Sequence, residues 1–508
     1  MDRSTNQKSE ARLFAPCLDT QVTCECGGEL TMPDYFPEIK RVISVSAAAL
    51  PDSKYIKDST LEVGGTLAFN LLYIGDDGTV CSAPYVTEYT HNVPIGKELS
   101  LSSSDIRVIS SVESSSCRPL APRTVSMKAK IKTKAFCDAP EDCTLKLVSG
   151  DKPIPSSAFE KYESTLTKVN RRSFSATGSV SGEKECSEGI KPVCCDGVIC
   201  IEGTSPSQNA VTVKGEAQIS CLVLTDEGLY KTVVCSLPFE ERITADGTTP
   251  DCRTAAHGRV ASVTASAEND SQVLSVDVEY DIDAAVCSET DVSVTDDIYS
   301  TDYSVEVTRK KLNALSLVCL ENGSVSVLGE GRRKSQRGDG DYIIFSDARA
   351  SFERLDIRDG AAILSGSCNF RVVIASGGDA VIEEFSVPVK YECTAKECNS
   401  SQNVTWNAVA SVCRAECRLE DSRLHGSCML NVFLEASKET QLMPVVHGEA
   451  VPSEQGDKSA SILRVCYPEK GQRIWNVFKT YCADASRCEQ INKVSRYDIS
   501  DGAPLIIK

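Results

Sequence analysis

Apolar and polar residues alternate with a period of two along much of this chain. The clearest run lies between Lys128 and Ala135, where lysines fill every second position. A second run, from Asp277 to Asp283, alternates acidic residues with apolar ones. Successive side chains of a strand point to opposite faces, so this pattern predicts strands with one buried and one solvated face. We interpret both charged faces as solvated, and pairing between the two ladders, within or between molecules, is the alternative.

One pattern occurs three times along the chain: a glycine, an alternating apolar run and a polar turn. The glycines are Gly65, Gly215 and Gly366, at intervals of 150 and 151 residues. A second anchor, a Ser-Val pair, recurs at intervals of 151 and 149 residues, at positions 111–112, 262–263 and 411–412. An aromatic residue follows each turn, namely Tyr89, Phe239 and Phe385. Two anchors with one period predict three copies of the same unit.

Each copy is predicted to be an all-β sandwich or open barrel. Leu67, Phe69 and Leu71 alternate with smaller or polar residues, which predicts one buried strand face. The polar turns that end at Gly78 and Gly228 favour hairpins. A copy of about 130 to 150 residues can bury a core of its own.

Polar, turn-rich segments are expected to join the copies. Two of them span residues 149–164 and 288–304. The domains that we predict are a flexible segment 1–17, β domains 18–148, 165–287 and 304–437, a linker 438–461 and a terminal domain 462–508.

The terminal domain has a different pattern. Ile474, Val477, Phe478 and Tyr481 fall on one face of a helix and are expected to be core. Ser486 is expected to cap a second helix, and short apolar strands flank the two helices. The predicted order is βααβ. Eight Lys/Arg against five Asp/Glu give these residues a net charge of +3, whereas the rest of the chain carries −21.

The whole chain has 508 residues and a net charge of −18. This acidic balance argues against nucleic acid or anionic lipid as the main partner. The sequence has no stretch of about 18 apolar residues, so membrane insertion is not expected. The first 20 residues lack a secretory signal pattern, and we therefore expect a cytosolic protein.

The 25 cysteines include no C-x-x-C pair, so no structural zinc site is expected. In a reducing compartment most thiols are expected to be small buried apolar groups, and later oxidative crosslinking of an assembly is the alternative.

No motif for catalysis emerges. None of the four histidines has a second histidine at ligand spacing. The segment 178–182 (GSVSG) has valine where a nucleophile elbow needs serine, and the segment 329–335 (GEGRRKS) lacks the phosphate-loop spacing. We predict no catalytic residue, metal or cofactor, although a hydrolase whose residues converge from distant strands stays open.

The terminal domain resembles a LysM module. Gly471-Gln-Arg-Ile-Trp475 matches the start of that family's first helix, and Tyr481 matches the tyrosine that ends it. Asn492 and the segment from Ile499 to Ile507 match the remaining motifs in order. Gln472 and Arg473 stand where the family has Asp-Thr beside its glycan groove, which favours a protein over a glycan as the ligand.

The first copy resembles a SPOCS domain of spore-coat proteins through the segments 32–50, 63–78 and 122–131. Three such copies and a terminal LysM module are similar to the SipL-like family of spore-coat morphogenetic proteins of endospore-forming bacteria.

This resemblance implies a non-enzymatic adaptor of spore coat assembly in the mother-cell cytoplasm, at the forespore surface. It implies that the LysM module binds the morphogenetic ATPase of the coat's basement layer. Other coat proteins and a second copy of the chain are further partners that the resemblance leaves open. The alternative is binding of peptidoglycan or cortex glycan.

Carried over residue by residue, the groove of the module comprises Gly471, Gln472, Arg473, Trp475, Asn492, Lys493, Arg496 and Tyr497. Trp475 is expected to be either a helix residue in the core or an interface anchor.

Overall fold

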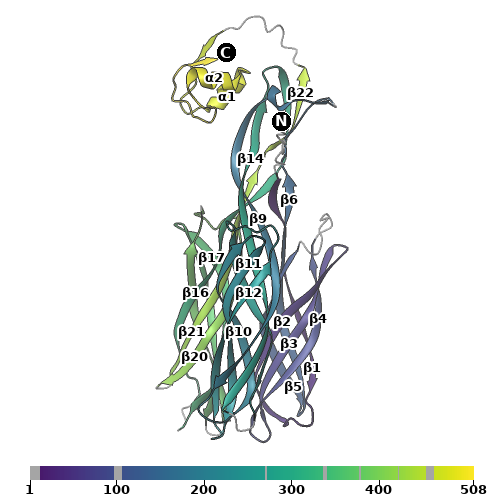
Figure 1. Ribbon diagram of the computed structural model, residues 1–508, viewed down its shortest axis with the longest axis vertical. Coiled ribbons are helices and arrows are strands. Elements are labelled where there is room, and N and C mark those ends of the chain that lie inside the picture. The colour runs from purple at the N-terminus through teal and green to yellow at the C-terminus, as the bar shows by residue number, and fades with distance from the viewer. Residues whose placement is uncertain are drawn as a thin grey trace.

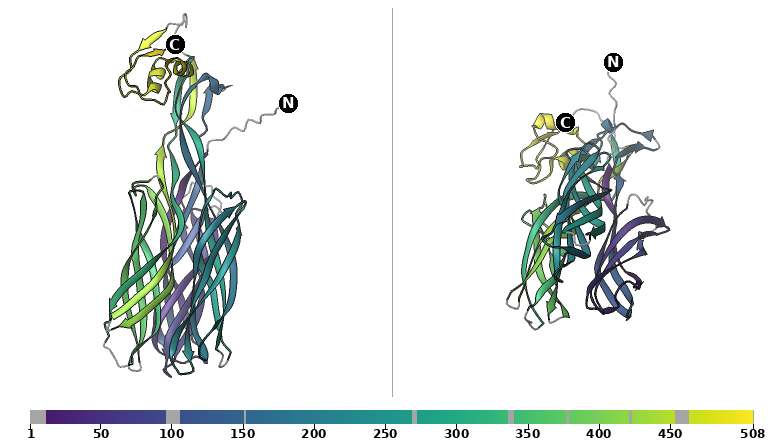
Figure 2. Two further views of the ribbon diagram at one scale, coloured as in Figure 1. Left: turned by 60° about the vertical axis from the view of Figure 1, so that its left-hand side comes forward. Right: turned by 60° about the horizontal axis from the view of Figure 1, so that its bottom comes forward.

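The molecule is mainly β, as the sequence predicts. The computed structural model describes residues 12–95, 106–150, 152–268, 272–335, 340–376, 379–396, 398–420, 423–452 and 463–507. Within these ranges long strands dominate, and both α-helices lie in the terminal domain. Three β units stand side by side, a narrower stalk rises from them, and the terminal domain sits at its tip (Figure 1; Figure 2).

Each unit consists of six strands in sequence. Unit 1 comprises β1 (Arg12–Thr31), β2 (Ile39–Lys57), β3 (Thr60–Gly75), β4 (Val80–Pro94), β5 (Arg107–Ala121) and β6 (Thr124–Asp142). Unit 2 comprises β9 (Glu160–Glu185), β10 (Ile190–Ser207), β11 (Ala210–Thr225), β12 (Tyr230–Thr244), β13 (Arg253–Ser266) and β14 (Val273–Tyr299). Unit 3 comprises β16 (Leu312–Arg332), β17 (Tyr342–Arg358), β18 (Ala361–Ser376), β19 (Asp379–Thr394), β20 (Val404–Glu420) and β21 (Arg423–Leu442).

All three units have the same sheet order. The second, third and fourth strands form one antiparallel sheet, and the first, sixth and fifth strands form the other. In unit 1 the core between the two sheets contains Leu67, Phe69 and Leu71 from β3, together with Met127 and Ile131 from β6. The alternation of β3 in the sequence thus corresponds to a buried face.

The three recurring glycines occupy one structural position. A Cβ at Gly65, Gly215 or Gly366 would collide with the backbone carbonyl of the neighbouring strand. At each site that strand carries a β-bulge one residue away, with an exposed acid as the extra residue: Asp52, Glu202 or Glu353. Only a residue without a side chain allows this close approach, so glycine is required there.

An aromatic residue lies opposite the recurring glycine in two of the three units. Tyr89 lies directly opposite Gly65, and Phe239 lies directly opposite Gly215. In unit 3, Val389 is opposite the glycine, whereas Phe385 faces Phe370. The aromatic of the third unit therefore follows the turn as in the other units but occupies a different position in the ladder.

Both charged ladders pair with their own sheets. Lys128 pairs with Glu25, and Lys130 with Glu113, in unit 1. In unit 2 the guanidinium of Arg259 lies 3.0 Å from Asp281. The ion pairs of the described residues join neither ladder to the other, and pairing between molecules stays a prediction.

The expected joints are largely strand. β14 continues through most of 288–304, and β9 begins inside 149–164, because the two strands pair with each other over these residues. β1 already begins at Arg12, inside the segment expected to be flexible. Of the expected linker, residues 438–442 belong to β21 and 445–452 to β22, and 453–461 lie outside the described residues.

The stalk forms where the strands leave the units. It contains β7 (Lys146–Ser149), β8 (Lys152–Pro153), β15 (Tyr303–Arg309) and β22 (Val445–Pro452). In the chain, β6 comes before β7, β9 follows β8, β14 comes before β15, and β21 comes before β22. The four short strands form one sheet in the order β15-β22-β7-β8. Leu147, Phe159, Ile298, Val445 and Ala450 give the stalk its own small core.

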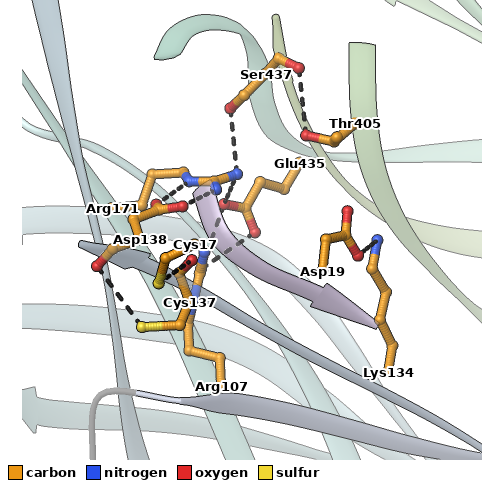
Figure 3. Close-up of polar contacts among 10 residues, drawn as sticks. All are labelled: Cys17, Asp19, Arg107, Lys134, Cys137, Asp138, Arg171, Thr405, Glu435 and Ser437. Carbon is orange, nitrogen blue, oxygen red and sulfur yellow. Dashed lines mark hydrogen bonds and ion pairs between the residues drawn. The ribbon is translucent and has the colours of Figure 1, made fainter. Parts of the chain in front are cut away.

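A buried charge cluster joins the three units near the base of the stalk (Figure 3). Arg171 of unit 2 binds both carboxylate oxygens of Asp138 in unit 1, at 2.5 and 2.7 Å. Glu435 of unit 3 lies 3.5 Å from Arg171 and 3.3 Å from Arg107 of unit 1. Burial opposes ionisation of Glu435, but the two guanidinium groups outweigh it and hold the pKa of this carboxyl below its ordinary value.

Two side-chain amides of unit 3 also bind the backbone of unit 2. The side-chain amides of Asn322 and Asn431 each donate to and accept from one backbone position of unit 2, at Ala256 and Ile201. Next to Ile201, Cys200 forms a disulfide with Cys413. This bond departs from the expectation of reduced thiols, whereas Cys221, Cys287 and Cys368 are buried free thiols, as expected.

Candidate protein-interaction site

The terminal domain has a core of its own. Its elements are β23 (Arg464–Cys466), α1 (Ile474–Thr480), α2 (Ala485–Asn492) and β24 (Leu505–Ile507), and the two strands pair antiparallel. Ile474, Val477 and Phe478 are buried as the helical spacing predicts. Tyr481 is not core: it is 41% exposed, because α1 ends at Thr480 and the residue leaves the helical path.

Two polar residues shape the second helix. Asp484, and not Ser486, is its N-cap, since the Asp484 carboxylate accepts from the backbone N–H of Arg487 at 2.8 Å. At the other end the amide of Asn492 donates to and accepts from the backbone of Ile506, at 2.7 Å each. Asn492 therefore ties α2 to β24 within the domain.

The loop before α1 forms an exposed edge. Gly471 has a φ of 91°, a conformation that favours glycine. Gly471 and Gln472 exchange backbone hydrogen bonds with Ser500, and Arg473 is exposed. Lys493, in the left-handed conformation that ends α2, is exposed as well.

Two acids and two tyrosines of the stalk face the terminal domain. Glu160 and Tyr162 are two residues apart on β9, and Asp297 and Tyr299 are two residues apart on β14. In the ladder Tyr162 pairs with Asp297, and Glu160 pairs with Tyr299. Residues at these positions share one face of a two-stranded ladder. We call these four residues the platform.

Asp297 is the centre of the contact. Its carboxylate accepts from the indole N–H of Trp475 at 2.8 Å and from the ammonium of Lys479 at 2.7 Å. On the stalk itself, Arg309 lies 3.5 Å from the same carboxylate. One carboxylate thus receives an aromatic donor and a cation from the same helix face.

Arg496 makes the second polar contact. It lies 2.9 Å from Glu160 of the platform and 3.0 Å from Glu489 of its own domain, and it also donates to the carbonyl of Lys161. Burial opposes ionisation of Glu489, but hydrogen bonds from Arg496 outweigh it and hold the pKa of Glu489 below its ordinary value. Those hydrogen bonds and the charge of Glu160 raise the pKa of Arg496, so this arginine stays charged.

The aromatic rings close the contact. Trp475 packs on Tyr299 and Tyr162, at ring-centroid distances of 4.9 and 5.5 Å, and Tyr162 also contacts Tyr497 at 5.0 Å. The Tyr299 hydroxyl donates to the carbonyl of Ala483 at 2.7 Å. Trp475 is 2% exposed and Tyr299 is 4% exposed, and both belong to one apolar cluster with the core of the terminal domain. Burial, followed by the charge of Glu160, raises the pKa of Tyr299, which keeps the hydroxyl protonated as a donor.

The structure thus divides the groove residues carried over from the LysM family. Trp475, Arg496 and Tyr497 face the platform, Gly471, Gln472, Arg473 and Lys493 lie on the loop edge and helix end, and Asn492 serves inside the domain. Trp475 is buried, as the core alternative predicts, and its role as an anchor for a partner stays a prediction.

Sequence reasoning missed the platform and Lys479, because the platform lies in the segments interpreted as joints. A signal was present: of the 15 tyrosines, only Tyr162 and Tyr299 have an acid two positions earlier.

A cavity lies between units 1 and 3. This cavity of about 1390 Å³ is walled by β5, β17 and β20 and their neighbours. Its lining carries five basic and five acidic side chains and contains no histidine or cysteine among the described residues. We assign it no chemistry.

Comparison of the chain with models of protein families, with curated proteins and with solved structures finds no match. No helix in the described part of the chain is long and apolar enough to cross a membrane. The described His, Cys, Asp and Glu residues form no cluster suited to a metal ion.

Proposed function

We propose that this protein is a non-enzymatic adaptor of spore envelope assembly. Its terminal domain binds the morphogenetic ATPase of the coat's basement layer and thereby tethers coat material to the forespore surface from the mother-cell side. The three β units form the body through which further coat proteins are recruited.

One observation carries this proposal: a basic terminal domain with its own core sits at the far tip of a stalk on an acidic body (Figure 1). The βααβ order and the buried face of α1 agree with a LysM-like module. A separate head on a spacer suits a tether, because it can reach a partner while the body remains accessible.

We further propose that the three units are copies of one SPOCS-like domain. The shared sheet order, the glycine at one position and the adjacent acidic bulge support common descent of the three units. These features recur at the sequence period of about 150 residues.

Glycan binding is the second candidate. The loop of Gly471, Gln472 and Arg473, of which Gly471 and Arg473 are exposed, is where the LysM family forms its sugar groove. Gln472 and Arg473 replace the family's Asp-Thr there, so we rank a protein ligand first.

The test compares the full chain with a chain that ends at Pro452, which lacks the terminal domain. The full chain should bind the immobilised ATPase, and the shortened chain should not. In sporulating cells the shortened, fluorescently tagged chain should lose its place at the forespore surface. Equal binding by both chains would contradict the proposal.

The same experiment also measures binding of chitin oligomers and muropeptides to the full chain. Binding with dissociation constants between about 1 μM and 1 mM, and none to the ATPase, would favour the second candidate.

A further inference from the structure

The platform has the properties of a ligand for the terminal domain. It belongs to the acidic body, and it meets a domain of opposite net charge. Glu160 and Asp297 each bind a cation of the terminal domain, and Tyr162 and Tyr299 each pack on Trp475. The interface therefore repeats one unit twice, an acid followed two residues later by a tyrosine on an extended strand.

The contact covers part of the partner-binding face that the LysM resemblance implies. Trp475, Arg496 and Tyr497 belong to that groove, and all three touch the platform. With Trp475 2% exposed, a second protein cannot reach its indole while the platform is in place. Interface anchors of this type work when they are desolvated in a pocket of the partner, and here the stalk fills that role.

We propose that the stalk tip is an internal ligand that closes the binding face, and that the face recognises an extended protein segment carrying an acid and an aromatic residue two positions apart. The inference rests on the proposed function in taking the terminal domain as a protein-binding module. It goes beyond that function by naming the chemistry of the recognised segment and the contact that must open first.

The stalk tip and a partner compete for the same face of the terminal domain, and this competition sets the apparent affinity for the partner. A partner binds only the fraction of molecules whose terminal domain has left the platform, so its apparent affinity falls by that fraction. If nine molecules in ten are closed, opening the contact should tighten binding about tenfold.

The test uses the full chain with two sets of substitutions. Trp406→Phe leaves Trp475 as the only tryptophan, whose fluorescence then reports docking. The opened variant adds Glu160→Gln, Tyr162→Ala, Asp297→Asn and Tyr299→Ala. Its matched control carries Glu163→Gln and Asp291→Asn, which remove two acids elsewhere in the same ladder. None of these side chains belongs to the core of the stalk.

The probe is a labelled cyclic hairpin peptide that contains residues 160–164 and 294–299 in their native pairing. In the opened variant Trp475 should become accessible to quencher, and the peptide should bind at least about tenfold more tightly than to the control chain. A peptide with Gln, Asn and Ala at the platform positions should not bind, and Trp475→Ala in the opened variant should abolish binding.

Two results would overturn the inference: Trp475 that stays protected in the opened variant, or an accessible Trp475 with no peptide binding. Binding of the ATPase separates this inference from the proposed function. If the peptide binds and the ATPase binds neither chain, the face recognises an acid and an aromatic residue two positions apart, and the ATPase is not its partner. If the ATPase binds the opened and control chains equally, it does not use this face, and the closing role is wrong.

Discussion

The carboxylate of Asp297 accepts a hydrogen bond from the indole of Trp475 at 2.8 Å, across 178 residues of sequence. It joins the far end of β14 to the first helix of the terminal domain (Figure 1). The tryptophan that the sequence singles out as a binding residue is thus engaged by the chain's own stalk.

Docking of the terminal domain should weaken with salt. Asp297 and Lys479 form an ion pair whose side chains remain 19% and 40% exposed, so mobile ions can screen it. Raising the ionic strength from about 0.05 M to about 1 M shortens the screening length to about 3 Å. In the Trp406→Phe chain, quenching of Trp475 should therefore increase with salt. Lys479→Gln should respond less, because among the described residues only the ion pair of Arg496 with Glu160 then remains across the contact, and an equal response would show that Lys479 does not hold the domain.

Glu435→Gln should destabilise the three-unit body. The substitution keeps the shape but leaves Arg107 and Arg171 without their shared buried carboxylate. Breaking a buried ion pair from one side costs about 3 to 5 kcal/mol. Thermal unfolding should show a clear fall in Tm, whereas Glu420→Gln on the exposed end of β20 should leave Tm nearly unchanged. Similar Tm values for both variants would remove Glu435 as the link between units.

The same carboxylate makes stability depend on pH. Its folded pKa lies below the unfolded value of about 4.3, so ionised Glu435 contributes fully above that value. The contribution is lost as the pH falls from there through the folded pKa. Denaturant unfolding at several pH values should show the gap between wild type and Glu435→Gln narrowing in acid. A gap that stays constant down to the acid transition would contradict this assignment.

The disulfide between Cys200 and Cys413 should stabilise protein prepared under oxidising conditions. It closes a loop of 213 residues between units 2 and 3, which constrains the unfolded chain and contributes about 2 to 5 kcal/mol. Reductant should lower Tm, and the double variant Cys200→Ser, Cys413→Ser should begin at the lower value and no longer respond. Cys482→Ser, at an exposed free thiol, is the control and should keep the wild-type response.

Gly215→Ala should destabilise unit 2, because its Cβ would collide with the carbonyl of Cys200 and approach the ring of Phe239. Overpacking of this kind costs about 1 to 3 kcal/mol. Gly203→Ala is a matched control on the adjacent strand, where a Cβ meets nothing within 4 Å. Chemical denaturation of both variants measures the difference, and equal stability would mean that the close approach does not require glycine.

Local patterns in the sequence determined much of the fold. Period-two runs place Leu67, Phe69 and Leu71 in the core of unit 1, and helical spacing places Ile474, Val477 and Phe478 in that of the terminal domain. The glycine spacing marks Gly65, Gly215 and Gly366, which share one close approach to the neighbouring strand. Such inferences succeed because strand and helix periods are set by backbone geometry within a few residues.

Predictions from local patterns were wrong where long-range strand pairing or the end of a helix determined the structure. The polar segment 288–304 continues as strand because β9 pairs with β14 over most of its length, and composition does not reveal a pairing partner. Tyr481 continues the helical spacing, yet α1 ends one residue earlier and leaves it exposed.

The sequence by itself determined the mainly β class, the period of about 150 residues and the separate basic tail. Only the tertiary structure decided that Glu160, Tyr162, Asp297 and Tyr299 form one surface and that Trp475 lies against it. Residues 160–162 and 297–299 are more than 130 positions apart in the chain, and antiparallel pairing of β9 with β14 brings their side chains onto one face. The contact with Trp475 then depends on where the stalk ends, which no local pattern encodes.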